Sequence, residues 1–448
     1  MGSDLAVERG EQAFGSFIKI AKSGQVTVAV PQAETGQGIW TALPQIVADE
    51  LGAAWNMVAV EPAPMTAAYA NPMAKAEGWP KHSRITAGST SVRGFELVLR
   101  HAAAVARTML VGAAADRLGV DPADCATGDG FVMNRGRTFT FGELAEEAAD
   151  RTPPLNPQLR QDQEGRLIGQ PLPRLDGPAK VDGSWRFAGD VRLPDLLYAS
   201  VRIAPPGGRL RDFDRAVIAS VNGVRHVSAR EGWLAVLAET WWAAERAVKG
   251  ADPQFSGYRT PSDIRRVFDH QLASGDADSW FSRGDYDRTV RGSRPLAATY
   301  YIAPSQHLGL EPLSATARAN SRGVEVWTGT QAPGFLMRED YVLYPLGVGE
   351  PAGRAMEPDL VSIAIELARE MKRPVQGSVS QSSNQNHDRV SPGALARMTA
   401  LPGDGGITAA WAMKVVTADG LGGALARLRN AELPGQFGKT ALDGAVPS

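Results

Sequence analysis

The chain has one cysteine among its 448 residues, and this scarcity excludes several cofactors. An iron–sulfur cluster takes four thiolates and a structural zinc site usually takes two or more, so Cys125 alone can hold neither. The six histidines are scattered, with no pair at helical ligand spacing. If the protein transfers electrons, its iron–sulfur clusters must therefore lie on another polypeptide.

Excess charge and long apolar runs are also lacking. Lys and Arg number 47 against 49 acidic residues, which gives no general electrostatic reason to bind nucleic acid. No run approaches the ~20 apolar residues that cross a bilayer, so no membrane span is expected. The first residues have neither an apolar signal core nor twin arginines. We expect a soluble protein of the cytoplasm or the periplasm.

Residues 14–150 predict alternating strands and helices. The alternating, β-branched residues 24–30 predict a strand, and a helix is expected after the following glycine loop, ending at Gly52. A second helix is expected over residues 92–118, with Ser91 available as its N-cap. Its predicted apolar face comprises Val98, Ala102, Val105 and Met109.

The remainder of the chain divides at a linker candidate. Residues 151–165 are rich in proline and polar side chains, which is typical of a linker. Further on, residues 397–416 predict a hairpin with a Pro/Gly/Asp turn. A helix is expected just before it, with Leu360, Ile363, Leu367 and Met371 on one face.

Three short stretches could bind a ligand. The first is Gly36-Gln37-Gly38, where the absence of a Cβ lets the backbone approach a ligand and glutamine offers a donor and an acceptor. The second is Ser89-Thr90-Ser91, which precedes a long helix and could bind an anion there, or simply cap the helix. The third is Gln331 in "TGTQAP".

Together, these stretches and "TALPQIVADELG" after the glycine loop resemble the molybdopterin-binding large subunits of the xanthine oxidase and aldehyde oxidase family. The likeness is to the N-terminal portion of the isoquinoline 1-oxidoreductase beta-subunit-like branch. It implies an α+β, multi-domain fold with molybdenum-cofactor-binding domains. Residues 14–150 would be the N-terminal cofactor-binding segment, and residues 166–255, with "FAGDVRLPDLLYAS", a small α/β hammerhead domain. Residues 256–448 would be the first large molybdopterin-binding domain, incomplete without a partner chain.

The resemblance also implies roles for residues. Gly36, Gln37 and Gly38 would hold the pterin of a molybdopterin cytosine dinucleotide, and Ser89, Thr90 and Ser91 would contact its phosphates. The Gln331 amide would contact an oxo ligand on molybdenum. His307 and Glu311 would brace the structure behind the site.

One segment departs from the family pattern. Relatives carry a Gly-Gly-Gly-Phe-Gly-Arg loop at the metal end of the pterin, where this chain has Gly349-Glu350-Pro351-Ala352-Gly353-Arg354. Proline removes an N–H and glutamate adds a charge, and both changes count against molybdenum at this loop. Gly349, Gly353 and Arg354 are kept as candidate cofactor contacts. The catalytic base is expected on a partner chain, with Glu350 as a less favoured alternative.

The implied activity is hydroxylation of an aldehyde or an N-heteroaromatic compound, with water as the oxygen source. Electrons would pass to a separate [2Fe-2S] small subunit, and the C-terminal half of the molybdenum subunit would be a separate chain. Neither FAD nor zinc is expected in this chain. One alternative is a cofactor-free hydrolase formed by cleavage after Ser448, with an N-terminal nucleophile on the partner chain. Another is a non-catalytic scaffold subunit.

Overall fold

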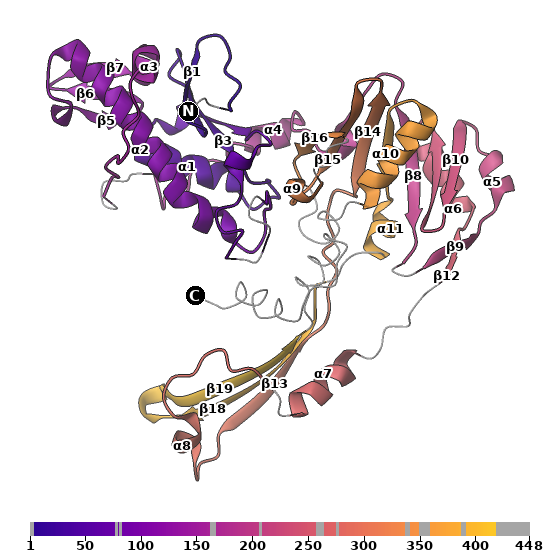
Figure 1. The fold of residues 1–448 in the computed structure, drawn as a ribbon. Helices are drawn as coiled ribbons and strands as arrows, with labels where there is room; N and C mark the ends of the chain where they lie inside the picture. The colour runs from indigo at the N-terminus through magenta and orange to yellow at the C-terminus, as the bar shows by residue number, and fades with distance from the viewer. Residues whose placement is uncertain are drawn as a thin grey trace.

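The protein was analysed as a computed structural model, and its fold is α+β with several sheets, as predicted (Figure 1). The structure describes residues 4–76, 79, 83–161, 167–205, 208–256, 264–274, 277–336, 341–348, 359–386 and 391–417. Three larger sheets organise it, and the first belongs to an N-terminal unit that matches the predicted strands and helices.

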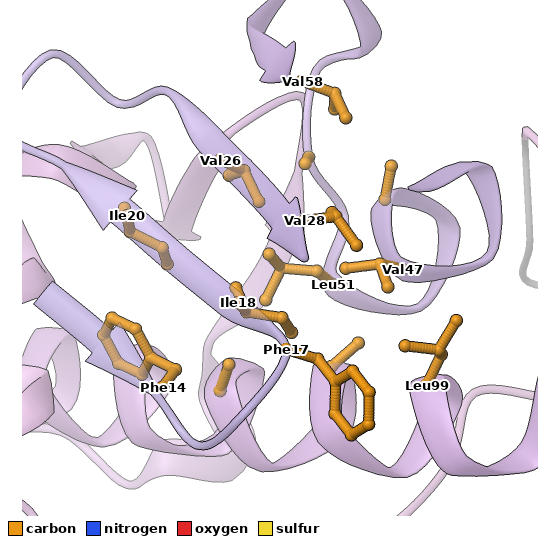
Figure 2. Close-up of a cluster of buried hydrophobic side chains, with 14 of the residues drawn as sticks. Phe14, Phe17, Ile18, Ile20, Val26, Val28, Val47, Leu51, Val58 and Leu99 are labelled. Carbon is orange, nitrogen blue, oxygen red and sulfur yellow. The ribbon is translucent and has the colours of Figure 1, made fainter. Parts of the chain in front are cut away.

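The N-terminal sheet has the order β1-β2-β3-β4, with β3 and β4 parallel and the other neighbours antiparallel. Its strands are β1 (Glu11–Phe14), β2 (Ile18–Ala21), β3 (Val26–Val30) and β4 (Val58–Pro62). Helix α1 (Ile39–Leu51) connects β3 to β4 and ends as predicted, because Gly52 adopts a φ of 84° and its N–H bonds the Ala48 carbonyl. Side chains of α1 and of the strands meet in one apolar core (Figure 2).

Helix α2 (Thr90–Leu118) crosses this core and ends before Gly119, as predicted. The predicted apolar face was partly right, because Met109 is buried and Ala102 and Val105 pack against the core, whereas Val98 is 36% exposed. The residues that are fully buried include Phe95, Leu99, Ala103, Ala106 and Leu110. Helix α2 is long and apolar enough to cross a membrane. Its packing against α1 and α3 (Phe141–Ala149) accounts for this, because a helix in a protein core is also long and apolar. A small sheet of β5 (Ala126–Gly128), β6 (Phe131–Asn134) and β7 (Arg137–Thr140) completes this unit.

The predicted linker packs against the N-terminal unit. Its described residues form no helix or strand, and the Arg160 N–H donates to the buried Glu50 carboxylate at 2.9 Å. The same carboxylate binds Arg100 and Arg107 of α2. The segment is therefore held in place by a buried acid of α1.

The second sheet has seven strands in the order β10-β11-β8-β17-β14-β15-β16. These are β8 (Leu197–Ile203), β10 (Val224–Arg230), β11 (Trp233–Ala238), β14 (Ser314–Asn320), β15 (Gly323–Gly329), β16 (Tyr341–Leu346) and β17 (Val375–Ser378). Helix α10 (Asp359–Met371) packs on β14 and β17, and α6 (Trp241–Gly250) packs on β8 and β11. Strands from the predicted hammerhead and large domains thus share one sheet, and the boundary at residue 255 stays a prediction.

The third sheet is antiparallel, with the order β13-β18-β19. It contains β13 (Leu296–Ile302) and the predicted hairpin, formed by β18 (Ala394–Pro402) and β19 (Thr408–Thr417). Figure 1 shows these strands extending away from the other two sheets, with α7 (Ile264–Ala273) and α8 (Tyr286–Val290) beside them. Shorter described elements are α4 (Gly177–Asp182), α5 (Arg215–Ala219), α9 (Pro333–Leu336), α11 (Gln381–Asn386), β9 (Arg209–Asp212) and β12 (Gln254–Ser256).

Candidate cofactor site

The structure brings together the three stretches that the sequence singled out. The loop after β3 meets the entrance of α2, where the Ser91 hydroxyl donates to the Gln32 side-chain oxygen at 2.8 Å. The entrance of α2 in turn meets the segment after β15, where the Thr86 N–H donates to the Gln331 carbonyl at 2.8 Å. The Thr86 hydroxyl also accepts from the Ala33 N–H at 2.8 Å, so the three stretches form one connected region.

The Gly-Gln-Gly loop is organised around a buried carboxylate, that of Glu34. Its side chain is fully buried and accepts the N–H groups of Gly36 at 2.7 Å, Gly38 at 3.1 Å and Trp40 at 3.0 Å. The sequence led us to expect that the glycine amides face a ligand, but an internal acid already occupies them. Among the described residues, the Gln37 N–H has no hydrogen-bond partner, so it is the loop amide that stays open to a ligand.

The Gln37 side chain is exposed and folds back on its own loop. Its oxygen accepts from the Thr35 N–H at 2.6 Å and the Thr35 hydroxyl at 2.8 Å, and its amide nitrogen donates to the Ala33 carbonyl at 2.9 Å. Gly36 has a φ of 96°, and no atom lies within 4 Å of the place where a Cβ would stand. The outer side of the loop is therefore open at a glycine.

Two cations and a second acid hold this loop against the segment that contains α4. Arg174 donates to Glu34 at 3.0 Å and to Asp176 at 2.7 Å, and Lys180 contacts Asp176 at 2.7 Å. Burial alone would raise the pKa of Asp176, but the hydrogen bonds and charges of the two cations lower it to about 2. The hydrogen bond to Asp176 is the main cause of a raised pKa at Arg174. The four charges balance, which lets two acids lie buried beside the loop.

The entrance of α2 keeps open donors. Helix α2 begins at Thr90, and the N-cap residue is Ser89, with a φ of 53° and no side-chain capping bond. The expectation of Ser91 as N-cap was therefore wrong, because its hydroxyl bonds Gln32 instead. Among the described residues, no acceptor pairs with the backbone N–H groups of Ser91 and Val92. An uncapped helix start with open N–H groups suits an anion.

Thr90 and Arg84 fix the path of this segment. The buried Thr90 hydroxyl donates to the Ala87 carbonyl and accepts from the Asn71 amide, each at 2.8 Å. The buried Arg84 guanidinium donates to the carbonyls of Ala63 and Pro64, and burial lowers its pKa to about 10. Thr90 thus serves the structure of the turn with its side chain.

Gln331 is buried at the junction. Its amide nitrogen donates to the Thr86 carbonyl at 3.0 Å, and its own carbonyl accepts the Thr86 N–H. Gly334 lies against the same segment, because a Cβ added to it would stand 2.7 Å from the backbone nitrogen of Arg84. The Gln331 amide is thus oriented by Thr86, and its contact with an oxo ligand stays a prediction.

The predicted metal loop, with Gly349, Glu350, Gly353 and Arg354, lies entirely outside the described residues. The residues that lead into it are described. The Val348 N–H donates to the Glu34 carbonyl at 3.1 Å, which ties this strand end to the Gly-Gln-Gly loop. Gly347 lies against Trp185, whose ring packs edge-on to Trp40 at a centroid distance of 5.0 Å.

The expected bracing residues make structural contacts. The Glu311 carboxylate accepts the Ala188 N–H at 2.9 Å, and His307 lies 3.1 Å from the Ser391 hydroxyl. Within the described part of the chain, no group of three His, Cys, Asp or Glu residues could hold a metal ion.

A cavity of about 440 Å³ lies apart from the predicted residues. It is mostly apolar and includes Met65, Arg186, Arg192, Trp327 and Tyr344 in its lining. The rings of Trp327 and Tyr344 stack at 5.1 Å. It contains none of the candidate site residues, although Val191, Arg192 and Leu193 of its lining belong to "FAGDVRLPDLLYAS".

The residues that hold the region together were missed in the sequence. Glu34 stands two residues before the Gly-Gln-Gly triplet. This spacing could have indicated its role, because a carboxylate at that position can reach the amides that follow it. Arg174, Asp176 and Lys180 gave no signal, because only the fold brings them to Glu34 across about 140 residues.

A family model described as a molybdopterin cofactor-binding domain matches residues 2–166. The beta subunit of isoquinoline 1-oxidoreductase from Brevundimonas diminuta is 28% identical over 80% of this chain and 53% of its own length. A nicotinate dehydrogenase subunit from Pseudomonas putida is 29% identical over 89% of this chain and 34% of its own length. The aldehyde oxidoreductase structure from Desulfovibrio gigas aligns with 55% of this chain and 34% of that one, with 14% identity and a TM-score of 0.41. The chain thus spans about half or less of the length of these relatives.

Proposed function

Because the chain belongs to the molybdopterin-binding large subunits of the xanthine oxidase and aldehyde oxidase family, we propose that it is a component of a molybdenum hydroxylase. The observation that carries the proposal is the meeting of the Gly-Gln-Gly loop, the start of α2 and Gln331 in one region. These are the residues to which the family resemblance assigns the cofactor. No observation favours the hydrolase or the scaffold alternative.

The residues present fit a pterin dinucleotide in two respects. The outer side of the loop is open at Gly36, with the Gln37 N–H and the second amide proton of its side chain available. The open N–H groups of Ser91 and Val92 suit the dinucleotide phosphates. Gly349, Gly353 and Arg354 would contact the metal end, and the base stays assigned to a partner chain.

When bound, the cofactor would supply oxygen transfer from water and a two-electron sink. The work of this chain is to bind and orient. Glu34 fixes the loop shape from behind, which leaves the outer side for the ligand. Gln331 would present its side-chain amide toward the metal end, while Thr86 holds its orientation.

The substrate class is an N-heteroaromatic compound or an aldehyde. The names of isoquinoline 1-oxidoreductase and nicotinate dehydrogenase support the heteroaromatic arm. Both relatives are named as parts of larger enzymes, which supports further chains here. We propose a [2Fe-2S] small subunit as electron acceptor, because the single cysteine of these 448 residues cannot ligate a cluster.

A charge placed at the helix start tests the cofactor assignment. Ser89 is exposed and makes no capping bond, so Ser89→Asp should leave the fold intact while repelling a phosphate. Ser89→Asn is the matched neutral control and tolerates the left-handed backbone. We expect the purified Asp variant to lose most of its bound pterin and cytidine nucleotide, with an unchanged thermal midpoint, and the Asn variant to keep both. Equal pterin content in the two variants would refute phosphate binding at this helix.

A further inference from the structure

The cavity between the N-terminal unit and the seven-stranded sheet has the features of a ligand site, and we propose that it binds a small aromatic carboxylate. Its volume of about 440 Å³ lies toward the small end of the range of about 300–1,000 Å³ that is typical of ligand pockets, which suits a ligand of one or two rings. Three segments line it: the end of β4 with the turn after it, the segment before β8, and the ends of β15 and β16. We call this cavity the arginine pocket, after Arg186 and Arg192 in its lining.

The walls of the arginine pocket are apolar and poor in hydrogen-bond donors. Three of its lining residues, Pro62, Pro64 and Pro345, have no backbone N–H. Among the described residues, no Asp or Glu lines the cavity. Trp327 and Tyr344 add a stacked aromatic pair, and a further ring can pack on the edge or the outer face of such a pair. The body of the ligand must therefore be apolar, and a planar ring is favoured.

The two arginines carry positive charge that no described acid pairs with. The Arg186 side chain makes no hydrogen bond or ion pair with a described residue. The Nη1 of Arg192 bonds the carbonyls of Gly189 and Val191 at 2.7 and 2.9 Å, which leaves its Nε and Nη2 without a partner in the described part of the chain. Asp190, between the two arginines in sequence, instead accepts a backbone N–H at 3.0 Å. The free edge of Arg192 presents two parallel N–H groups, which match the two oxygens of a carboxylate.

The segment that carries both arginines is held at several points. Phe187 pairs with Gly347 in a parallel bridge just beyond the end of β16. The Gln376 amide donates to the carbonyls of Ala188 and Val191, at 3.3 and 3.2 Å. The two guanidinium groups therefore extend from a fixed backbone, which lowers the entropy lost when a ligand binds. Both arginines are exposed, so they stand where the cavity meets solvent.

A third guanidinium lies behind the wall formed by residues 62–65. The Arg84 side chain bonds the carbonyls of Ala63 and Pro64, and the residue is only 6% exposed. No described acid forms an ion pair with Arg84. A charge in a poorly solvated position acts over a longer distance than one in water. The arginine pocket is therefore positive on two sides, and it favours an anion.

An aromatic carboxylate satisfies both parts of the arginine pocket. Its ring packs against the apolar walls, and its carboxylate reaches Arg186 and Arg192 at the mouth. An inorganic phosphate would match the arginines alone, and a neutral ring would match the walls alone. None of the candidate cofactor residues lines the cavity, so this binding needs no molybdenum and goes beyond the proposed function.

Binding of 2-naphthoate tests the site, with its neutral amide, 2-naphthamide, as the matched ligand. Isothermal titration calorimetry of the protein purified from its native host, with the chains that co-purify, measures the dissociation constants. Arg186→Gln removes a charge at the mouth, and Tyr344→Leu removes aromatic surface. Arg322→Gln is the matched control, because Arg322 is exposed in the turn between β14 and β15 and does not line the cavity. Arg186 has no partner among the described residues, so its variant should keep the thermal midpoint of the wild type.

We expect Arg186→Gln and Tyr344→Leu each to weaken 2-naphthoate binding about fivefold, and Arg322→Gln to leave it unchanged. The wild type should prefer the acid over the amide, and Arg186→Gln should reduce that preference. Absence of 2-naphthoate binding to the wild type, equal affinity in Arg186→Gln, or an amide that binds as tightly as the acid would overturn the inference.

The Ser89→Asp variant separates the arginine pocket from the cofactor region. We expect it to bind 2-naphthoate as the wild type does, even when its pterin is lost. Binding that is lost in Ser89→Asp and unchanged in Arg186→Gln would assign the carboxylate to the cofactor region and overturn the inference. Binding that depends on Arg186 in a protein without pterin would support the arginine pocket and refute the proposed function alone.

Discussion

Replacing Glu34 should disorganise the Gly-Gln-Gly loop, because its carboxylate accepts three backbone N–H groups and one guanidinium. Glu34→Ala leaves the Trp40 N–H and the partly exposed Arg174 without this acceptor, while the exposed Gly36 N–H can bind water. A buried donor without a partner costs about 1–3 kcal/mol, and a broken buried ion pair about 3–5 kcal/mol. Because Arg174 is 40% exposed and water screens its charge, we expect Glu34→Ala to lower the free energy of unfolding by about 3 kcal/mol.

The isosteric variant separates charge from shape. Glu34→Gln keeps one acceptor oxygen but turns a donor toward the Trp40 N–H or toward Arg174. It should therefore lower the free energy of unfolding by about 1–2 kcal/mol. Urea unfolding followed by tryptophan fluorescence measures both variants, and hydrogen exchange at the Gly38 and Trp40 amides reports the loop itself. Unfolding midpoints and exchange rates equal to wild type in Glu34→Ala would refute this account of the loop.

Two further changes test the region around this carboxylate. The pKa of Asp176 is about 2 in the folded protein and 3.8 ordinarily, so its ionised form contributes about 2 kcal/mol to the free energy of unfolding. This contribution is complete above pH 4 and is lost as the pH falls toward 2. Asp176→Asn should therefore weaken the fall of stability at acid pH, and an unchanged acid dependence would contradict the ion cluster. Gly334→Ala places a Cβ 2.7 Å from the backbone nitrogen of Arg84. It should therefore lower the free energy of unfolding by about 1–3 kcal/mol and speed hydrogen exchange of the Thr86 amide. Gly232→Ala, which meets no atom within 4 Å, is the control, and similar exchange in the two variants would refute the close approach.

Local patterns in the sequence predicted much of the fold. The end of α1 at Gly52 and the β18–β19 hairpin followed from glycine and turn chemistry, which act over a few residues. Val98 was wrongly placed on the buried face of α2 because small alanines on several sides of the helix blur its apolar period.

The site was predictable in its location but not in its support. Gly36 and Gln331 were marked by motifs, whereas Asp176 and Arg174 act through contacts between segments that are distant in the sequence. The same limit applies to the third sheet. Alternation identifies β19 as a strand, but only the positions of α7 and α8 show which of its two faces is covered.

The central claim is that this chain holds a molybdenum–pterin cofactor at the region of Gly36, Ser89 and Gln331. The most direct measurement is the molybdenum, pterin and cytidine content of the complex purified from its native host. The account predicts about one of each per copy of this chain, and a lower pterin content in the Ser89→Asp variant. A pure complex that contains neither molybdenum nor pterin would contradict it.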